Sequence, residues 1–243
     1  MSRPLVALAR SNARVRAVFL VASALAFVAR LSAQDAPRWP DTFTGRLEVL
    51  ALMQTLNAEI LSSRSSTATL ETWCGDHHLA DPARIVADLV AGAASTPTAE
   101  RLAHLEVPSA ADVKYRHVRL RCGGHVLSEA DNWYVPARLT PEMNRTLETS
   151  DAPFGRVVAP LEPYRRTFSV TLLWSPLPDG WERGKPAQPV VSARTLEIPG
   201  AIFEHRAVLY TKDHRPFSEV VEIYQRDVLA FPPPADPRDE PAK

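Results

Sequence analysis

Arginine side chains are the most promising binding groups in this sequence. Residues 113–122 alternate between apolar and polar types, which predicts a strand with His117, Arg119 and Arg121 on one face. Val118 and Leu120 point to the other face. A planar guanidinium group binds a carboxylate through two parallel hydrogen bonds, so these residues could hold a small acid. The alternative is a solvated strand face on which arginines bind no ligand.

Two glutamates near the C-terminus could complete such a site. Glu219 and Glu222 lie three positions apart in an expected strand, so their side chains point to opposite faces and at most one lines a given pocket. Several arginines with one glutamate suit a small dianion that carries a hydroxyl group. A glutamate in an apolar pocket could donate a proton if desolvation raised its pKa.

Several other kinds of chemistry are excluded by the sequence. It contains no Gly-x-Gly-x-x-Gly, no Walker loop, no Gly-x-Ser-x-Gly elbow and no His-Glu-x-x-His. Residues 1–33 hold five arginines and no acid, which leaves 23 basic against 28 acidic residues in the remainder. This acidic balance disfavours nucleic acid and anionic membranes as partners.

The N-terminal segment resembles a signal peptide. A basic start precedes an apolar run at residues 17–29 that only Ser23 interrupts. This run is shorter than the roughly 20 residues of a membrane-spanning helix and suits a signal peptide core. We expect cleavage near Ala33, export to the periplasm or the outside, and no stable membrane insertion afterwards. An uncleaved anchor is the alternative.

The two cysteines have three interpretations. In an exported protein, Cys74 and Cys122 are first expected to form a disulfide. Each also begins a Cys-x-x-His sequence, ending at His77 and His125, so a four-ligand zinc site is a second interpretation. Two free buried thiols are the third.

The remaining pattern places helices first and strands afterwards, which predicts an α+β domain with an antiparallel sheet of about six strands and N-terminal helices packed on one face. Helices are expected at residues 46–64, 67–76, 82–90 and 140–149. Strands are expected at residues 113–122, 125–135, 154–161, 165–174, 203–211 and 217–229. One domain should cover residues 34–230, followed by a disordered proline-rich tail at 231–243.

Four segments resemble chorismate lyase, in the order in which that family has them, and the resemblance spans roughly residues 45–230. They are Ser65–Glu71, Arg119–Gly123, Ala152–Arg156 and Glu222–Tyr224, with Arg166-Thr-Phe168 in a further matching place. The same fold class holds the effector-binding domains of some bacterial transcription regulators, which bind small molecules without chemistry.

The resemblance also implies a site. Backbone amides near Ser66 and Phe154 would hold a carboxylate, with Gly155 and Arg156 in the same turn. Glu222 would contact a ring hydroxyl group.

An arginine before Cys122 would pair with the carboxylate in this family. Counting back from that cysteine, the arginine position falls on His117, with Arg116 and Arg119 beside it. We expect Arg119 and His117 to share the role, although a shift of one residue would select Arg116. Arg119 and Glu222 are thus the expected catalytic pair.

The implied activity is the elimination of pyruvate from chorismate, which yields 4-hydroxybenzoate. Aromatisation drives this reaction, so we expect no cofactor and no metal, and a monomer that positions the substrate and stabilises charge. An exported protein that binds a small aromatic carboxylate without turnover is the first alternative, since the family works in the cytoplasm. A protein-contact role for Trp133, Tyr134 and the proline-rich loop is the second.

Overall fold

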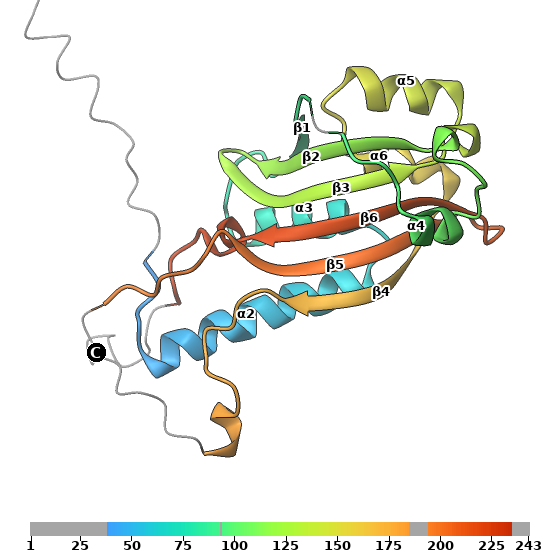
Figure 1. Ribbon diagram of the computed structural model, residues 1–243. Coiled ribbons are helices and arrows are strands. Elements are labelled where there is room, and N and C mark those ends of the chain that lie inside the picture. The colour runs from blue at the N-terminus through green and yellow to red at the C-terminus, as the bar shows by residue number, and fades with distance from the viewer. Residues whose placement is uncertain (1–37, 93, 185–193, 235–243) are drawn as a thin grey trace, which may run out of the picture. The chain divides into compact units, whose positions relative to one another are not determined.

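The computed structural model describes residues 38–92, 94–184 and 194–234. The expected signal peptide therefore lies outside the described residues, as does the end of the expected tail. In the described part of the chain, six strands form one antiparallel sheet in the order β1-β2-β3-β6-β5-β4 (Figure 1). The strands are β1 (Ile85–Leu89), β2 (Lys114–Cys122), β3 (His125–Tyr134), β4 (Tyr164–Leu172), β5 (Ala201–Tyr210) and β6 (Pro216–Gln225).

Helices lie on both faces of this sheet, and α2, α3 and α6 lie behind it in Figure 1 while α4 lies in front. The helices are α2 (Phe43–Ser62), α3 (Ser66–Asp76), α4 (Ala99–His104), α5 (Pro141–Thr149) and α6 (Phe154–Val157). The α+β class, the six-stranded sheet and the packing of the N-terminal helices on one face are confirmed. None of the described helices is long and apolar enough to cross a membrane.

The main core lies between the sheet and the helices behind it. Helix α2 begins after the capping hydroxyl of Thr42 and buries Val49, Met53, Leu56 and Ile60. Helix α3 begins after Ser65, whose side chain accepts a hydrogen bond from the amide of Ala68. A smaller apolar cluster around Leu105, Trp133 and Val221 lies under α4 on the other face. The sheet is thus covered on both faces near α4.

The two cysteines are bonded to each other. The Cys74–Cys122 disulfide joins α3 to the end of β2, and both residues are fully buried. The disulfide interpretation is confirmed, and the zinc and free-thiol interpretations are wrong. His77, expected as a zinc ligand in one interpretation, stacks on Phe231 with ring centroids 4.0 Å apart.

Three expectations about the elements are wrong. Residues 85–89 form a strand that pairs with β2, where the sequence predicted a helix. Residues 154–161, expected as a strand, form α6 and the short 3-10 helix Ala159–Leu161. Phe231 is only 9% exposed and belongs to the core, so the domain extends past the expected boundary at residue 230.

Candidate binding pocket

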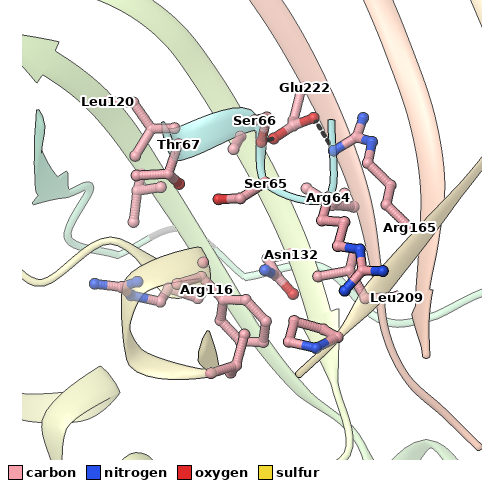
Figure 2. A pocket seen from close by; sticks show the side chains of 17 residues that line it. Arg64, Ser65, Ser66, Thr67, Arg116, Leu120, Asn132, Arg165, Leu209 and Glu222 are labelled. Carbon is pink, nitrogen blue, oxygen red and sulfur yellow. Dashed lines mark hydrogen bonds and ion pairs between the residues drawn. The ribbon is translucent and has the colours of Figure 1, made fainter. Parts of the chain in front are cut away.

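A small pocket lies between the sheet and the helices α3 and α6. Its volume is about 50 Å³. Strands β2 to β6 supply its floor, and the starts of α3 and α6 supply its opposite wall (Figure 2). The lining side chains with charged or hydrogen-bonding groups are Arg64, Ser65, Ser66, Thr67, Arg116, Asn132, Arg165 and Glu222.

Arg116 is the most unusual of these residues. Its side chain is buried, with 4% of the residue exposed, and its Nη2 atom donates to the carbonyl oxygen of Ala152 at 3.1 Å. Its Nε and Nη1 atoms have no hydrogen-bond partner among the described residues. Burial lowers the pKa of Arg116 from its ordinary value. Such a cation lacks the partner that buried charges require.

Across the pocket, Glu222 is held by three donors. The Nη1 atom of Arg165 lies 2.5 Å from Oε2 of Glu222, and the hydroxyl group of Ser66 donates to Oε1 at 2.5 Å. Tyr224 donates to Oε2 at 3.1 Å. Burial raises the pKa of Glu222, but the Arg165 guanidinium and these hydrogen bonds outweigh burial and bring the pKa below its ordinary value. Glu222 is therefore ionised, and the conditional expectation that it donates a proton is not supported.

Two further groups face the cavity with donors. The Oδ1 atom of Asn132 accepts a hydrogen bond from Ser218 at 2.6 Å, which leaves the amide NH2 group for the pocket. The Nη2 atom of Arg165 is buried and has no hydrogen-bond partner among the described residues. Since α3 begins at this wall, its dipole also favours a negative charge here. The pocket thus offers unpaired donors from several directions.

A second, larger cavity adjoins the pocket on the helix side. Its volume is about 420 Å³, and its lining includes Ala68, Ala159 and an ion pair between Arg156 and Glu71. We call it the outer cavity and the first one the inner pocket. The two share five lining residues, namely Arg64, Ser65, Thr67, Gly155 and Pro163.

Most of the residues expected at the site converge on these cavities. Ser66, Phe154, Gly155 and Glu222 line the inner pocket, and Arg156 lines the outer cavity. Their convergence joins segments more than 150 positions apart, as the Ser66–Glu222 hydrogen bond shows.

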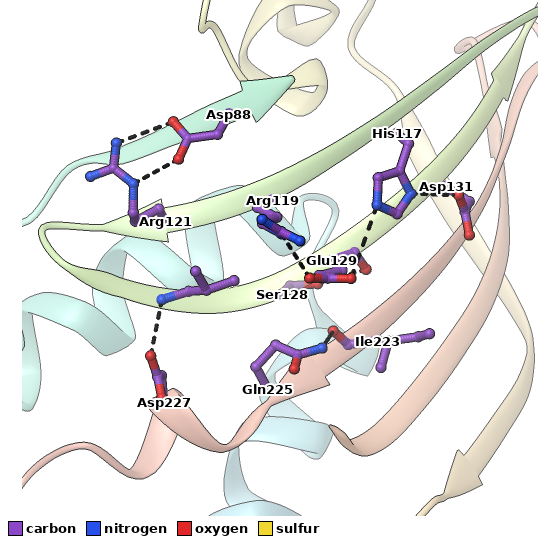
Figure 3. Close-up of polar contacts among 11 residues, drawn as sticks. Asp88, His117, Arg119, Arg121, Ser128, Glu129, Asp131, Ile223, Gln225 and Asp227 are labelled. Atoms are coloured by element: carbon purple, nitrogen blue, oxygen red, sulfur yellow. Dashed lines mark hydrogen bonds and ion pairs between the residues drawn. The ribbon is translucent and has the colours of Figure 1, made fainter. Parts of the chain in front are cut away.

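His117 and Arg119 lie on the opposite face of the sheet, so their expected place in the site is wrong. His117 contacts Asp131 at 2.7 Å, and Arg119 is exposed and pairs with Glu129 at 2.9 Å (Figure 3). Alternate residues of a strand point to opposite faces, so Arg116, which has the parity of the buried Val118, lies on the pocket side of the sheet and lines the pocket. A shift of one residue thus selects Arg116, as the sequence allowed.

Glu219 lies on the face opposite Glu222, as their spacing predicted. Its carboxylate pairs with Arg101 at 3.2 Å and with His104 at 2.8 Å. Arg64 and Asn132 were missed as site residues, because a loop arginine and a strand asparagine carry no distinctive sequence signal. In the part of the chain that the structure describes, no group of three or more His, Cys, Asp or Glu residues could hold a metal ion.

No protein-family profile matches the chain. A relative is the uncharacterized protein y4mC of Sinorhizobium fredii (strain NBRC 101917 / NGR234), which is 47% identical over 220 residues that cover 89% of this chain and 92% of that protein. The chain belongs to the family of y4mC.

Solved structures of related shape are more distant. PhnF from Mycobacterium smegmatis matches with a TM-score of 0.41 and 17% identity over 63% of each chain, so this chain spans less than two thirds of that protein. The effector domain of PhnF matches with a TM-score of 0.38 and 16% identity, over 59% of this chain and 82% of the domain. A GntR-family transcriptional regulator from Bacillus cereus matches with a TM-score of 0.36 and 11% identity, over 63% of this chain and 99% of that one. With TM-scores below 0.5, these likenesses do not bear on what the y4mC-family pocket binds.

Proposed function

We propose that this protein binds a small aromatic acid, with the acid's carboxylate at Arg116. The observation that carries the proposal is the pair of buried N–H groups on Arg116, at Nε and Nη1, that have no partner among the described residues. Unsatisfied donors on a buried cation cost about 1–3 kcal/mol each, and more for charged groups. A carboxylate in the inner pocket would accept hydrogen bonds from them and neutralise the charge.

The rest of the inner pocket suits the edge of an aromatic ring next to the carboxylate. Around the cationic end, the walls are apolar and come from Val118, Leu120, Phe154, Val158, Leu209 and Val220. The resemblance to chorismate lyase also supports an aromatic acid, since the one-residue shift that it allowed selects Arg116. Ligand pockets are typically apolar with a few polar groups that fix orientation, as here.

Binding without turnover is favoured over catalysis by the state of Glu222. Its carboxylate accepts hydrogen bonds from Ser66, Arg165 and Tyr224, and its lowered pKa keeps it ionised near neutral pH. It can therefore orient a ligand hydroxyl group but is a poor proton donor. Chorismate lyase activity is the second candidate, because Ser66, Phe154 and Glu222 meet at one pocket as the resemblance implied.

Calorimetric titration of the purified protein with benzoate, 4-hydroxybenzoate and the uncharged analogue benzamide tests the proposal. We expect both acids to bind and benzamide not to bind. Arg116→Met should weaken the acids by about 2–5 kcal/mol, since it removes a charged partner. Arg119→Met is the matched control on the same strand, because Arg119 faces away from the pocket. Equal binding of benzoate and benzamide, or unchanged affinity in Arg116→Met, would refute the proposal.

Incubation with chorismate separates the two candidates. Release of pyruvate and 4-hydroxybenzoate in equal amounts, lost in Arg116→Met, would establish the lyase. We expect 4-hydroxybenzoate to bind and no product to form.

A further inference from the structure

The inner pocket is too small to enclose an aromatic ring. Its volume is about 50 Å³. An apolar protein cavity that takes up benzene measures about 150 Å³, and a single water needs about 10–15 Å³. The inner pocket therefore has room for a carboxylate and the edge of a ring, and the rest of the ligand must lie elsewhere.

The outer cavity supplies that space. It has a volume of about 420 Å³ and shares Ser65, Thr67 and Gly155 with the inner pocket. A Cβ atom placed on Gly155 would lie 3.0 Å from both the Ser65 and the Thr67 hydroxyl oxygens. These three residues are therefore in close contact and leave no passage between them, so a ligand that fills both spaces crosses beside the other two shared residues, Arg64 and Pro163.

The lining of the outer cavity indicates what would fill it. Ala68, Ala159 and Pro163 offer apolar surface, the Arg156–Glu71 ion pair neutralises its own charges, and the exposed Glu162 adds one further acid at the rim. Arg64 is exposed at the border of both cavities and forms no ion pair or hydrogen bond with the described residues. A mainly apolar group with a hydrogen-bond acceptor near Arg64 matches this surface.

We infer that the ligand is an extended acid, whose carboxylate lies at Arg116 and whose second, ring-sized apolar part passes Arg64 and Pro163 into the outer cavity. The inference rests on the proposed function, because the proposed function supplies the position of the carboxylate at Arg116. It adds the ligand class, namely an aromatic acid joined to a second ring-sized group by an ether or ester oxygen that accepts from Arg64.

The test compares benzoate with the benzyl ethers of 3- and 4-hydroxybenzoate, all titrated calorimetrically into the full-length protein. We expect at least one ether to bind about tenfold or more tightly than benzoate. Ala68→Trp should reduce this ratio to about one, because Ala68 is an exposed residue of α3 that lines only the outer cavity. Ala51→Trp, at an exposed position of α2 outside both cavities, is the matched control and should keep the full ratio.

Equal affinity of benzoate and both ethers in the unaltered protein, or an ether advantage that survives Ala68→Trp, would overturn the inference and leave the proposed function intact. Failure of every acid to bind would instead overturn the proposed function.

Discussion

Arg116→Met should make the ligand-free protein more stable while it weakens acid binding. The side chain holds two buried N–H groups without partners, which together cost about 2–6 kcal/mol. Its one hydrogen bond of good geometry, to the carbonyl oxygen of Ala152 at 3.1 Å, stabilises the folded protein by about 1.5–3 kcal/mol. Methionine has similar length, adapts to irregular space and needs no partner. We therefore expect the free energy of unfolding to rise by about 1–3 kcal/mol.

Urea denaturation followed by tryptophan fluorescence measures this gain, and each kcal/mol corresponds to about 2–4 °C in melting temperature for a domain of this size. Arg119→Met is the control, since that exposed side chain has only a surface ion pair with Glu129, and its removal should change stability by no more than about 1 kcal/mol. If Arg116→Met lowered stability by more than 1 kcal/mol, Arg116 would be a structural residue and the reasoning from its unpaired donors would be refuted.

Three other predictions concern stability. Replacing Cys74 and Cys122 by alanine should lower the free energy of unfolding by about 4 kcal/mol, because the disulfide closes a loop of 48 residues and restricts the unfolded chain. An unchanged midpoint of urea denaturation would contradict this prediction. Burial, and to a smaller extent the charge of Arg165, lowers the pKa of His205 from 6.5 to about 4. On acidification His205 therefore takes up a proton in the unfolded chain at a higher pH than in the folded protein, so the free energy of unfolding should fall as the pH drops from 6.5 to 4. His205→Gln should flatten that part of a plot of melting temperature against pH, and an equally steep fall would exclude His205 as its cause. Because the pKa of Glu222 is lowered in the folded protein, its ionised side chain stabilises the fold above the ordinary glutamate pKa, and this stabilisation is lost as the pH falls through the lowered pKa. Glu222→Gln should therefore be less stable than the unaltered protein at pH 7 and lose less stability on acidification. Equal stability of the two proteins at pH 7 would show that the ion pair contributes nothing.

The fold class was predictable because long periodic segments decide it. Helix α2 and the β2-β3 hairpin have clear periods of 3.6 and two residues, and the glycine pair after Cys122 marks the turn. Short apolar runs are ambiguous. Ile85, Val86 and Leu89 fit one face of a helix, but in the folded protein they form a strand that pairs with the edge of β2. Tertiary pairing of this kind is invisible in a local pattern.

The site was predictable only up to one step of strand register. The sequence grouped His117 and Arg119 correctly on one face, but that face is the solvated one. The deciding signal was the parity of Val118, since an arginine two positions from a buried valine must point to the same side. Which arginine lacks a partner depends on the acids that the fold brings near, and no sequence pattern gives that.

The position of β6 has a consequence for how the chain reaches this structure. It is the last of the described strands along the chain, yet it lies in the middle of the sheet, between β3 and β5. Until residues 216–225 leave the ribosome, β3 has an open edge that can pair with other chains. The pairing of β6 with β3 and β5, which joins the two halves of the sheet, must therefore form late, and such long-range pairing slows folding. A chain truncated before residue 216 should aggregate, and only a complete one can bring Glu222 to Ser66.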